Sequence, residues 1–321
     1  MKSFESRTKV SIVLPAYNEE RAIGGVLARI RALRIPHSEV LVVDDGSTDG
    51  TARVAVEHGA RVIRHPYNIG NGAAVKTGLR AARGELVVLM DGDGQHAPQD
   101  VPSLLEKAAE GYDMVVAARV RGSRAPWQRK LANWIYNRFA SYVTQFPVRD
   151  LTSGFRVVRR RAALRFLGLL PNRFSYPTTL TLAFLRSGLS VHYLPVPHHE
   201  RIGKSKIRPW EDGIRFLLII AKIATLFSPF RVFLPVSGAF FATGLGYYLY
   251  TYFTQHRFTN MSVLLFTTSV VIFMMGLVSE QIALLRMERI EADGGARTVP
   301  LRAVSGPGRG ADEPGARTLL P

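Results

Sequence analysis

The amino-acid sequence predicts an α/β domain with a mostly parallel sheet, followed by two membrane-spanning helices. Its N-terminal part alternates short apolar segments, rich in β-branched residues, with segments of helical pattern. Its C-terminal part holds two long apolar runs without a charged residue. The composition agrees, because 47% hydrophobic residues in a chain of 321 exclude an intrinsically disordered protein. Cysteine is absent, which excludes disulfides, zinc–thiolate sites and iron–sulfur clusters.

Five short apolar segments predict strands, and the segments between them predict helices. The strands are expected at residues 10–14, 40–44, 61–64, 86–90 and 114–117, and the helices at 19–33, 49–58, 71–82 and 98–110. This alternation forms βαβ units, so we expect a Rossmann-like parallel sheet covered by helices on both faces. Ligands of such sheets bind at the carboxyl ends of the strands.

Polar, acid-rich clusters follow three of these strands, at residues 15–19, 44–47 and 91–95. In the last cluster Asp91 and Asp93 stand two residues apart, which places both carboxylates on one side of an extended chain. Hard carboxylates suit Mg²⁺ or Mn²⁺, and such an ion keeps waters and substrate phosphates as further ligands. The simpler alternatives are an Asp–Gly turn here, a helix cap at Asn18 and a turn at Ser47.

The glycine-rich segment 70–75 raises the alternative of a dinucleotide site. It follows the third strand and not the first, and it lacks the last glycine of that fingerprint. A complete phosphate-binding loop of the Gly-X-X-X-X-Gly-Lys-Ser/Thr type is also absent from the sequence. A nicotinamide cofactor is therefore not expected.

Residues 232–255 and 258–279 contain no charged side chain. A helix of this length spans about 33 Å, against a hydrocarbon core of about 30 Å. Two buried core helices are the alternative. The short link predicts a hairpin, and basic residues on either side of it place both ends in the cytoplasm. These residues are Arg208, Arg215, Lys222, Arg231, Arg286 and Arg289.

Glu280 lies near the end of the second run, where pairing with Arg286 or reach to the interface is expected. The polar segment 1–9 predicts no signal peptide. Residues 290–321 contain few apolar side chains and predict a disordered cytosolic tail.

The net charge of +17 is unevenly distributed. Residues 119–165 carry 12 basic and one acidic side chain, whereas residues 1–118 carry 14 basic and 15 acidic ones. Apolar and aromatic residues recur at helical spacing over 127–143, which predicts an amphipathic helix in the membrane interface. Residues 210–226 are a second candidate, and a helix packed on the domain is the alternative for both. A basic block beside a membrane favours anionic lipids over nucleic acid as partners.

Three motifs resemble the inverting glycosyltransferase family 2 domain, which has the GT-A fold: VSIVLPAYNEE (10–20), VVDDGSTDGT (42–51) and LMDGDGQH (89–96). Three later segments resemble its polyprenyl-phosphate branch, which includes dolichol-phosphate mannosyltransferase and undecaprenyl-phosphate sugar transferases. These segments are DLTSGFR (150–156), RIGKSK (201–206) and residues 276–286 with Glu280. The resemblance covers residues 8 to 291.

The resemblance implies a site for a nucleotide-sugar donor. Residues expected to line the base and ribose pocket are Pro15, Tyr17, Glu19, Asp44 and Asp45. Residues expected to hold Mg²⁺ or Mn²⁺ against the diphosphate are Asp91, Asp93 and Gln95. Basic residues expected to reach the diphosphate or to close the loop over it are Arg119, Arg201 and Lys206.

The resemblance also implies a site for a lipid acceptor. Arg129 and Asn133 match the pair that meets the lipid phosphate, and Asn133 stands where relatives often have serine. Asp150, Ser153 and Arg156 match the acceptor motif beside the bond that breaks. Asp150 and Asp93 are the expected catalytic residues. Asp150 either orients the acceptor or accepts a proton, and the alternative is a loop carboxylate paired with Arg149 or Arg156.

The expected organisation has four parts. They are a cytosolic GT-A domain at 1–208 with its basic acceptor region at 119–165, an amphipathic helix at 209–228, two membrane helices at 229–289 and a tail at 290–321. The expected reaction is inverting transfer of a hexose from a nucleotide sugar to polyprenyl phosphate at the cytosolic face of the inner or plasma membrane. UDP-hexose is favoured slightly over GDP-mannose, and relatives suggest a homo-oligomer.

Two alternatives belong to other classes of protein. A processive polysaccharide synthase should carry a Gln-X-X-Arg-Trp motif, which this sequence lacks. The second alternative is a membrane-tethered nucleotide-sugar-binding protein without activity. The intact pair of Asp91 and Asp93 argues against it.

Overall fold

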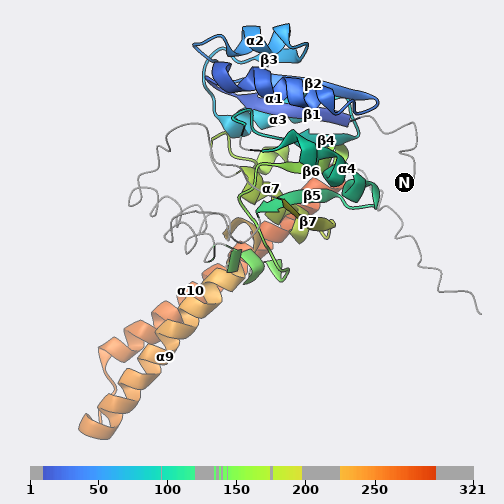
Figure 1. The fold of residues 1–321 in the computed structure, drawn as a ribbon. Helices are drawn as coiled ribbons and strands as arrows, with labels where there is room; N and C mark the ends of the chain where they lie inside the picture. Colours follow the sequence, from blue (N-terminus) through green and yellow to red (C-terminus); the bar gives the residue numbers. More distant parts are fainter. Residues whose placement is uncertain are drawn as a thin grey trace, which may run out of the picture.

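The structure, a computed structural model, describes residues 10–94, 96–119, 134, 137, 138, 140–142, 144–173, 176–196 and 225–293, the last four of them by backbone alone. Its centre is a seven-stranded sheet in the order β3-β2-β1-β4-β6-β5-β7 (Figure 1). The strands are β1 Val10–Ala16, β2 Ser38–Asp44, β3 Arg61–Arg64, β4 Leu86–Leu89, β5 Met114–Arg119, β6 Arg156–Arg159 and β7 Val191–Val196. All five predicted strands are confirmed.

Successive strand residues point to opposite sides of the sheet. Both faces are apolar here, and helices cover both of them. Ile12 and Leu14 of β1 join an apolar cluster with α1 and α4, whereas Val13 joins a second cluster with α3 and α7. The helices of this domain are α1 Glu20–Ala32, α2 Thr51–Glu57, α3 Asn71–Ala81, α4 Val101–Ala109, α6 Arg160–Arg165 and α7 Tyr176–Arg186, with short 3-10 helices at Pro98–Asp100 and Leu167–Leu169. The four predicted helices are confirmed, as is the predicted mostly parallel sheet covered on both faces.

One strand breaks the parallel pattern. β6 lies between β4 and β5 and runs antiparallel to both, with Leu89 of β4 opposite Arg156. The strand was not predicted, because its short sequence is flanked by arginines within the basic block. Because β6 runs the opposite way, the residues just before it lie at the carboxyl ends of β4 and β5.

The C-terminal hairpin consists of α9 Pro229–Gln255 and α10 Asn260–Asp293, and it projects from the domain (Figure 1). Both helices are long and apolar enough to cross a membrane, and only 11% and 17% of their most apolar windows are buried. Buried core helices, the alternative, would be mostly covered. Two reciprocal hydrogen bonds join the helices of the hairpin. Ser237 Oγ donates to the Ser269 carbonyl at 3.0 Å, and Ser269 Oγ donates to the Ser237 carbonyl at 2.9 Å.

Two details of the hairpin differ from expectation. α10 continues to Asp293, past the expected boundary at 289, and residues 294–321 of the predicted tail lie outside the described residues. Glu280 pairs with Arg186 of α7, not with Arg286. The sequence favoured Arg286 because it is near in the chain, whereas α7 approaches only through the tertiary fold.

Candidate active site

The loops after β1 and β2 are joined to each other by side chain to backbone hydrogen bonds. The Asn18 N–H donates to Ser47 Oγ at 2.9 Å, and the Thr48 N–H donates to Asn18 Oδ1 at 2.9 Å. Asn18 adopts a left-handed conformation with φ of 56°, which asparagine tolerates well. Asn18 is therefore not the predicted helix cap, and it ties two strand ends together.

The first turn of α1 is capped by the neighbouring loop. The Glu19 N–H donates to Thr51 Oγ1 at 2.9 Å, and the Glu20 N–H donates to Asp49 Oδ2 at 3.2 Å. Helix amide groups without partners in their own helix normally need such acceptors. Tyr17, 43% exposed, therefore projects from a loop whose backbone is held from both sides.

The two adjacent aspartates at the end of β2 have different surroundings. Asp45 is buried, and its Oδ1 accepts from His65 Nδ1 at 2.7 Å while its Oδ2 accepts from the Gly70 N–H at 2.8 Å. Asp44 is fully buried, and its Oδ2 lies 3.1 Å from Arg64 Nε. That oxygen has no aligned hydrogen-bond donor among the described residues. Asp45 thus holds the following loop, whereas Asp44 pairs with Arg64 and its Oδ1 accepts from the Ser47 N–H at 3.0 Å.

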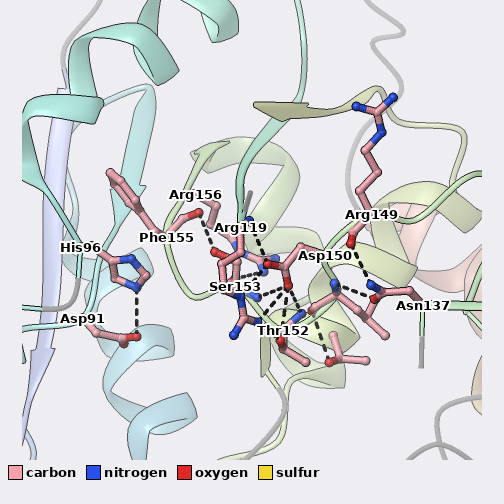
Figure 2. A network of polar contacts seen from close by, with 12 residues as sticks. Asp91, His96, Arg119, Asn137, Arg149, Asp150, Thr152, Ser153, Phe155 and Arg156 are labelled. Atoms are coloured by element: carbon pink, nitrogen blue, oxygen red, sulfur yellow. Dashed lines mark hydrogen bonds and ion pairs between the residues drawn. The ribbon is translucent and has the colours of Figure 1, made fainter. Parts of the chain in front are cut away.

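Asp91 and Asp93 follow β4 at the same edge of the sheet, as predicted. The Asp91 side chain is 33% exposed, and its Oδ2 lies 3.7 Å from His96 Nε2 (Figure 2). Burial alone would raise the pKa of Asp91, but His96 and the Asn71 side chain outweigh it, so the pKa lies below its ordinary value. His96 also packs against the Phe155 ring at 5.1 Å, so it contacts both Asp91 and the segment before β6.

Gly154 brings the segment before β6 directly against Asp91. A Cβ at this glycine would stand 2.8 Å from Asp91 Oδ2 and 3.3 Å from Tyr176 Oη. The Tyr176 hydroxyl donates to the Gly154 carbonyl at 3.3 Å. A larger residue at 154 would therefore collide with the carboxylate expected to hold the metal.

Asp150 forms a forked ion pair with Arg119. Arg119 Nε donates to Oδ2 at 2.8 Å and Nη2 donates to Oδ1 at 3.1 Å (Figure 2). The N–H groups of Thr152 and Ser153 donate to Oδ1 as well. The partner is thus Arg119, and pairing with Arg149 or Arg156 was the wrong alternative. Burial would raise the pKa of Asp150, but the Arg119 hydrogen bond and charge lower it below its usual range.

Arg156 lies inside the fold. It is 0% exposed, and its Nη1 donates to the Pro177 carbonyl at 3.0 Å and to Thr181 Oγ1 at 2.9 Å. Its Nη2 donates to the Ser153 carbonyl. Ser153 is also buried, at 5% exposure. In this arrangement both residues hold the 150–155 segment, and neither presents a side chain to an acceptor phosphate.

Asn137 and Ser141, which were not among the predicted site residues, hold the chain just before and at the start of this segment. Asn137 Nδ2 donates to the Arg149 carbonyl at 2.7 Å, and its Oδ1 accepts from the Leu151 N–H at 3.2 Å (Figure 2). Ser141 Oγ accepts from the Val148 N–H at 2.9 Å. Their spacing of four residues on a helix was the available signal.

Asn137 and Ser141 belong to the predicted amphipathic segment 127–143, whose described residues are helical. Trp134 is 59% exposed and Tyr142 46% exposed, while Ala140 is buried. The aromatic residues thus face outward and the small polar residues face the domain. Of 210–226, the second candidate helix, only residues 225 and 226 are described.

Five predicted site residues lie outside the described residues: Gln95, Arg129, Asn133, Arg201 and Lys206. Within the described part of the chain, no three His, Cys, Asp or Glu side chains cluster as a metal site. Asp91 and Asp93, both half-buried, still suit Mg²⁺ or Mn²⁺, because such ions take substrate phosphates and water as further ligands. Pro15 is buried in β1, and Glu19 is half-buried beside Tyr17.

Comparison with known sequences defines the class of protein. Residues 11–166 match the family described as glycosyl transferase family 2, and residues 228–285 match the GtrB C-terminal hairpin. An uncharacterized glycosyltransferase of Mycobacterium bovis is 37% identical over 62% of this chain and 89% of its own length. A dolichyl-phosphate hexose transferase of Haloferax volcanii is 32% identical over 67% of this chain and 93% of its own.

Two further comparisons agree. An undecaprenyl-phosphate 4-deoxy-4-formamido-L-arabinose transferase of Aeromonas hydrophila is 33% identical over 61% of this chain and 62% of its own length. Glucosyl-3-phosphoglycerate synthase from Mycobacterium tuberculosis, solved with Mn²⁺, UDP-glucose and phosphoglyceric acid, is 26% identical with a TM-score of 0.55. That match covers 68% of this chain and 79% of the other. The chain belongs to glycosyltransferase family 2.

Proposed function

We propose that this glycosyltransferase moves a hexose from a nucleotide sugar to a polyprenyl phosphate at the cytosolic face of a membrane, with inversion at the anomeric carbon. The single observation that carries the proposal is the contact at Gly154, where the acceptor segment 150–155 meets Asp91. A donor site and an acceptor segment that touch define a place for the reacting atoms. The two candidate spans and the lipid-phosphate names of the relatives support a lipid acceptor.

The donor is expected to lie along the edge formed by β2, β1 and β4. Asp44 would stand beside the base and ribose, where its pairing with Arg64 and its hydrogen bond from the Ser47 N–H fix the loop after β2. Asp45 positions the loop before α3 and does not need to contact the donor. UDP-hexose remains slightly favoured over GDP-mannose. The acidic motif itself is compatible with both donors.

Asp91 and Asp93 would hold Mg²⁺ or Mn²⁺, and the Mn²⁺ bound with UDP-glucose in the similar synthase supports this assignment. When bound, the ion would neutralise charge on the leaving nucleoside diphosphate. His96 and Asn71 lower the pKa of Asp91, which favours the ionised carboxylate that a metal ion requires.

The acceptor nucleophile is a phosphate oxygen, which is already ionised near neutral pH. It attacks the anomeric carbon while the bond to the leaving diphosphate oxygen breaks, so a strong general base is not required. The lowered pKa of Asp150 makes it a weak base, and its ion pair instead fixes Arg119 and the 150–155 segment. Positioning and charge complementarity then supply most of the rate.

A panel of nucleotide sugars assayed with undecaprenyl phosphate in vesicles tests the proposal. We expect one donor to yield a lipid-linked sugar whose anomeric configuration is opposite to that of the donor. Release of free sugar without lipid product from every donor would contradict the assignment of the acceptor.

Asp93→Ala tests the metal assignment. We expect transfer with Mn²⁺ present to fall by about a thousandfold, because the diphosphate loses its ion. The control is Glu106→Gln, which removes an exposed acid on α4 and should leave the rate unchanged. Near-normal turnover of the Asp93 variant would show that this carboxylate does not hold the metal.

A further inference from the structure

Both ends of the membrane hairpin are built into the catalytic domain. Phe227, just before α9, is 1% exposed and belongs to the apolar cluster beneath the sheet. α10 runs on past Glu280 to Asp293, with Ala283 buried and Met287 packed against that same cluster. Where α10 reaches the domain, it also contacts α6. The hairpin therefore packs against the core of the catalytic domain through residues at both of its ends.

Glu280 stands where three elements meet. Its Oε2 accepts from the Phe230 N–H at 3.1 Å, in the first turn of α9, and its Oε1 lies 3.7 Å from Arg186 Nη2, at the end of α7. The first-turn amide groups of a helix need acceptors, and a carboxylate is favourable at that end of the helix dipole. An acidic residue near the end of a membrane span is costly unless it has partners such as these.

The opposite end of α7 lies in the active site. Tyr176, its first residue, donates to the Gly154 carbonyl, and Pro177 and Thr181 hold Arg156. A helix of 11 residues is about 16 Å long. One rigid helix therefore joins the acceptor segment 150–155 to the Glu280 carboxylate and the start of α9.

We propose that Glu280 is a positioning residue that fixes the height and tilt of the active site above the bilayer. It acts through Arg186 and α7 on the acceptor segment, and through Phe230 on the start of α9. The membrane fixes the height of the lipid phosphate, which diffuses only laterally. A shift or tilt of the catalytic domain would therefore move Asp150 away from this phosphate. The donor arrives from solution and does not depend on this alignment. This inference rests on the proposed lipid acceptor.

The test compares two acceptors in one reconstituted full-length protein. For Glu280→Ala, we expect kcat/KM for undecaprenyl phosphate in vesicles to fall about tenfold, because small misplacements at the site are costly. With a short water-soluble isoprenyl phosphate, kcat/KM should change by less than about twofold, and the donor KM should be unchanged. Glu280→Gln keeps an oxygen for the Phe230 N–H and should show a smaller loss. Arg186→Ala, which removes the ion-pair partner of Glu280, should show a loss of kcat/KM similar to that of Glu280→Gln.

Glu288→Gln is the matched control, because it removes an exposed acid from the same helix. If the wild-type protein is active, equal losses of kcat/KM with the two acceptors, or no loss with either, would overturn the inference. A wild-type protein inactive with both acceptors would instead contradict the proposed function. If Glu280→Ala fails to fold, the acceptor dependence of Glu280→Gln and Arg186→Ala decides in the same way.

Discussion

The donor edge and the acceptor segment of this glycosyltransferase are held in place by different kinds of contact. At the donor edge, the loops after β1 and β2 bind each other across neighbouring parallel strands, through Asn18, Ser47 and Thr51. The acceptor segment 150–155 is held by Arg119, Asn137 and Arg156, which come from three separate elements. The donor edge is thus formed by adjacent βα units, whereas the acceptor segment depends on correct docking of distant parts.

After the loss expected for Asp93→Ala, the largest effect on activity is expected at the Arg119–Asp150 ion pair. Arg119→Lys keeps the charge but loses the fork that binds both carboxylate oxygens. We expect kcat to fall by about a hundredfold with the donor KM nearly unchanged, as measured by initial rates at varied donor concentration. A rise in donor KM with normal kcat would show that Arg119 serves the donor edge instead.

The pH dependence of this pair follows from the lowered pKa of Asp150. A carboxylate with a lowered pKa in the folded state contributes stability above its unfolded pKa of about 3.9, and loses it as pH falls through the folded value. Activity between pH 6 and pH 9 should therefore show no titration of Asp150. Thermal unfolding of wild type and Asp150→Asn should converge only in strong acid.

The next effect is expected at the donor edge, as a loss of stability. Asp45→Asn keeps the shape but replaces one carboxylate oxygen with an amide donor that faces buried N–H groups. We expect the free energy of unfolding to fall by about 2 kcal/mol, roughly 30-fold in the equilibrium constant. Thermal unfolding in detergent measures it. Glu57→Gln, at an exposed ion pair with Arg53, should change stability little.

Gly154→Ala tests the point where the two regions meet. The added methyl would press on Asp91 Oδ2, so we expect about a tenfold loss of transfer while the protein stays folded. Gly25→Ala is the control, because a Cβ there meets nothing within 4 Å. Full activity of the Gly154 variant would mean that the acceptor segment is not constrained by the acid pair.

The smallest effect is expected at Asn137. Asn137→Ala removes both hydrogen bonds that flank Asp150, and we expect kcat to fall about fivefold with the donor KM unchanged. Thr144→Ala removes a hydroxyl from the same helix whose hydrogen bonds, among the described residues, go to Ala140 and Phe146. If both variants lose activity equally, the loss comes from a disturbed helix and not from the hydrogen bonds of Asn137 beside Asp150.

Much of the donor edge could be predicted from the sequence, because its signals are local. The alternation of β-branched and helical segments predicted β1 to β5, and Asp91 and Asp93 follow β4 as expected. The acceptor side could not be predicted in the same way. Arg156 belongs to a family motif, yet its burial depends on Thr181 of α7, and a stretch of arginines gives no sign of an antiparallel strand.

The sequence by itself determined the fold class, the acid clusters at the strand ends and the apolar hairpin, because hydrophobic period and residue spacing are encoded within a few residues. The tertiary structure alone decided the partners: Arg119 for Asp150, Arg186 for Glu280 and Gly154 against Asp91. A charged side chain can pair with many others in the chain. Only the insertion of β6 and the docking of α7 and α10 bring particular pairs within reach.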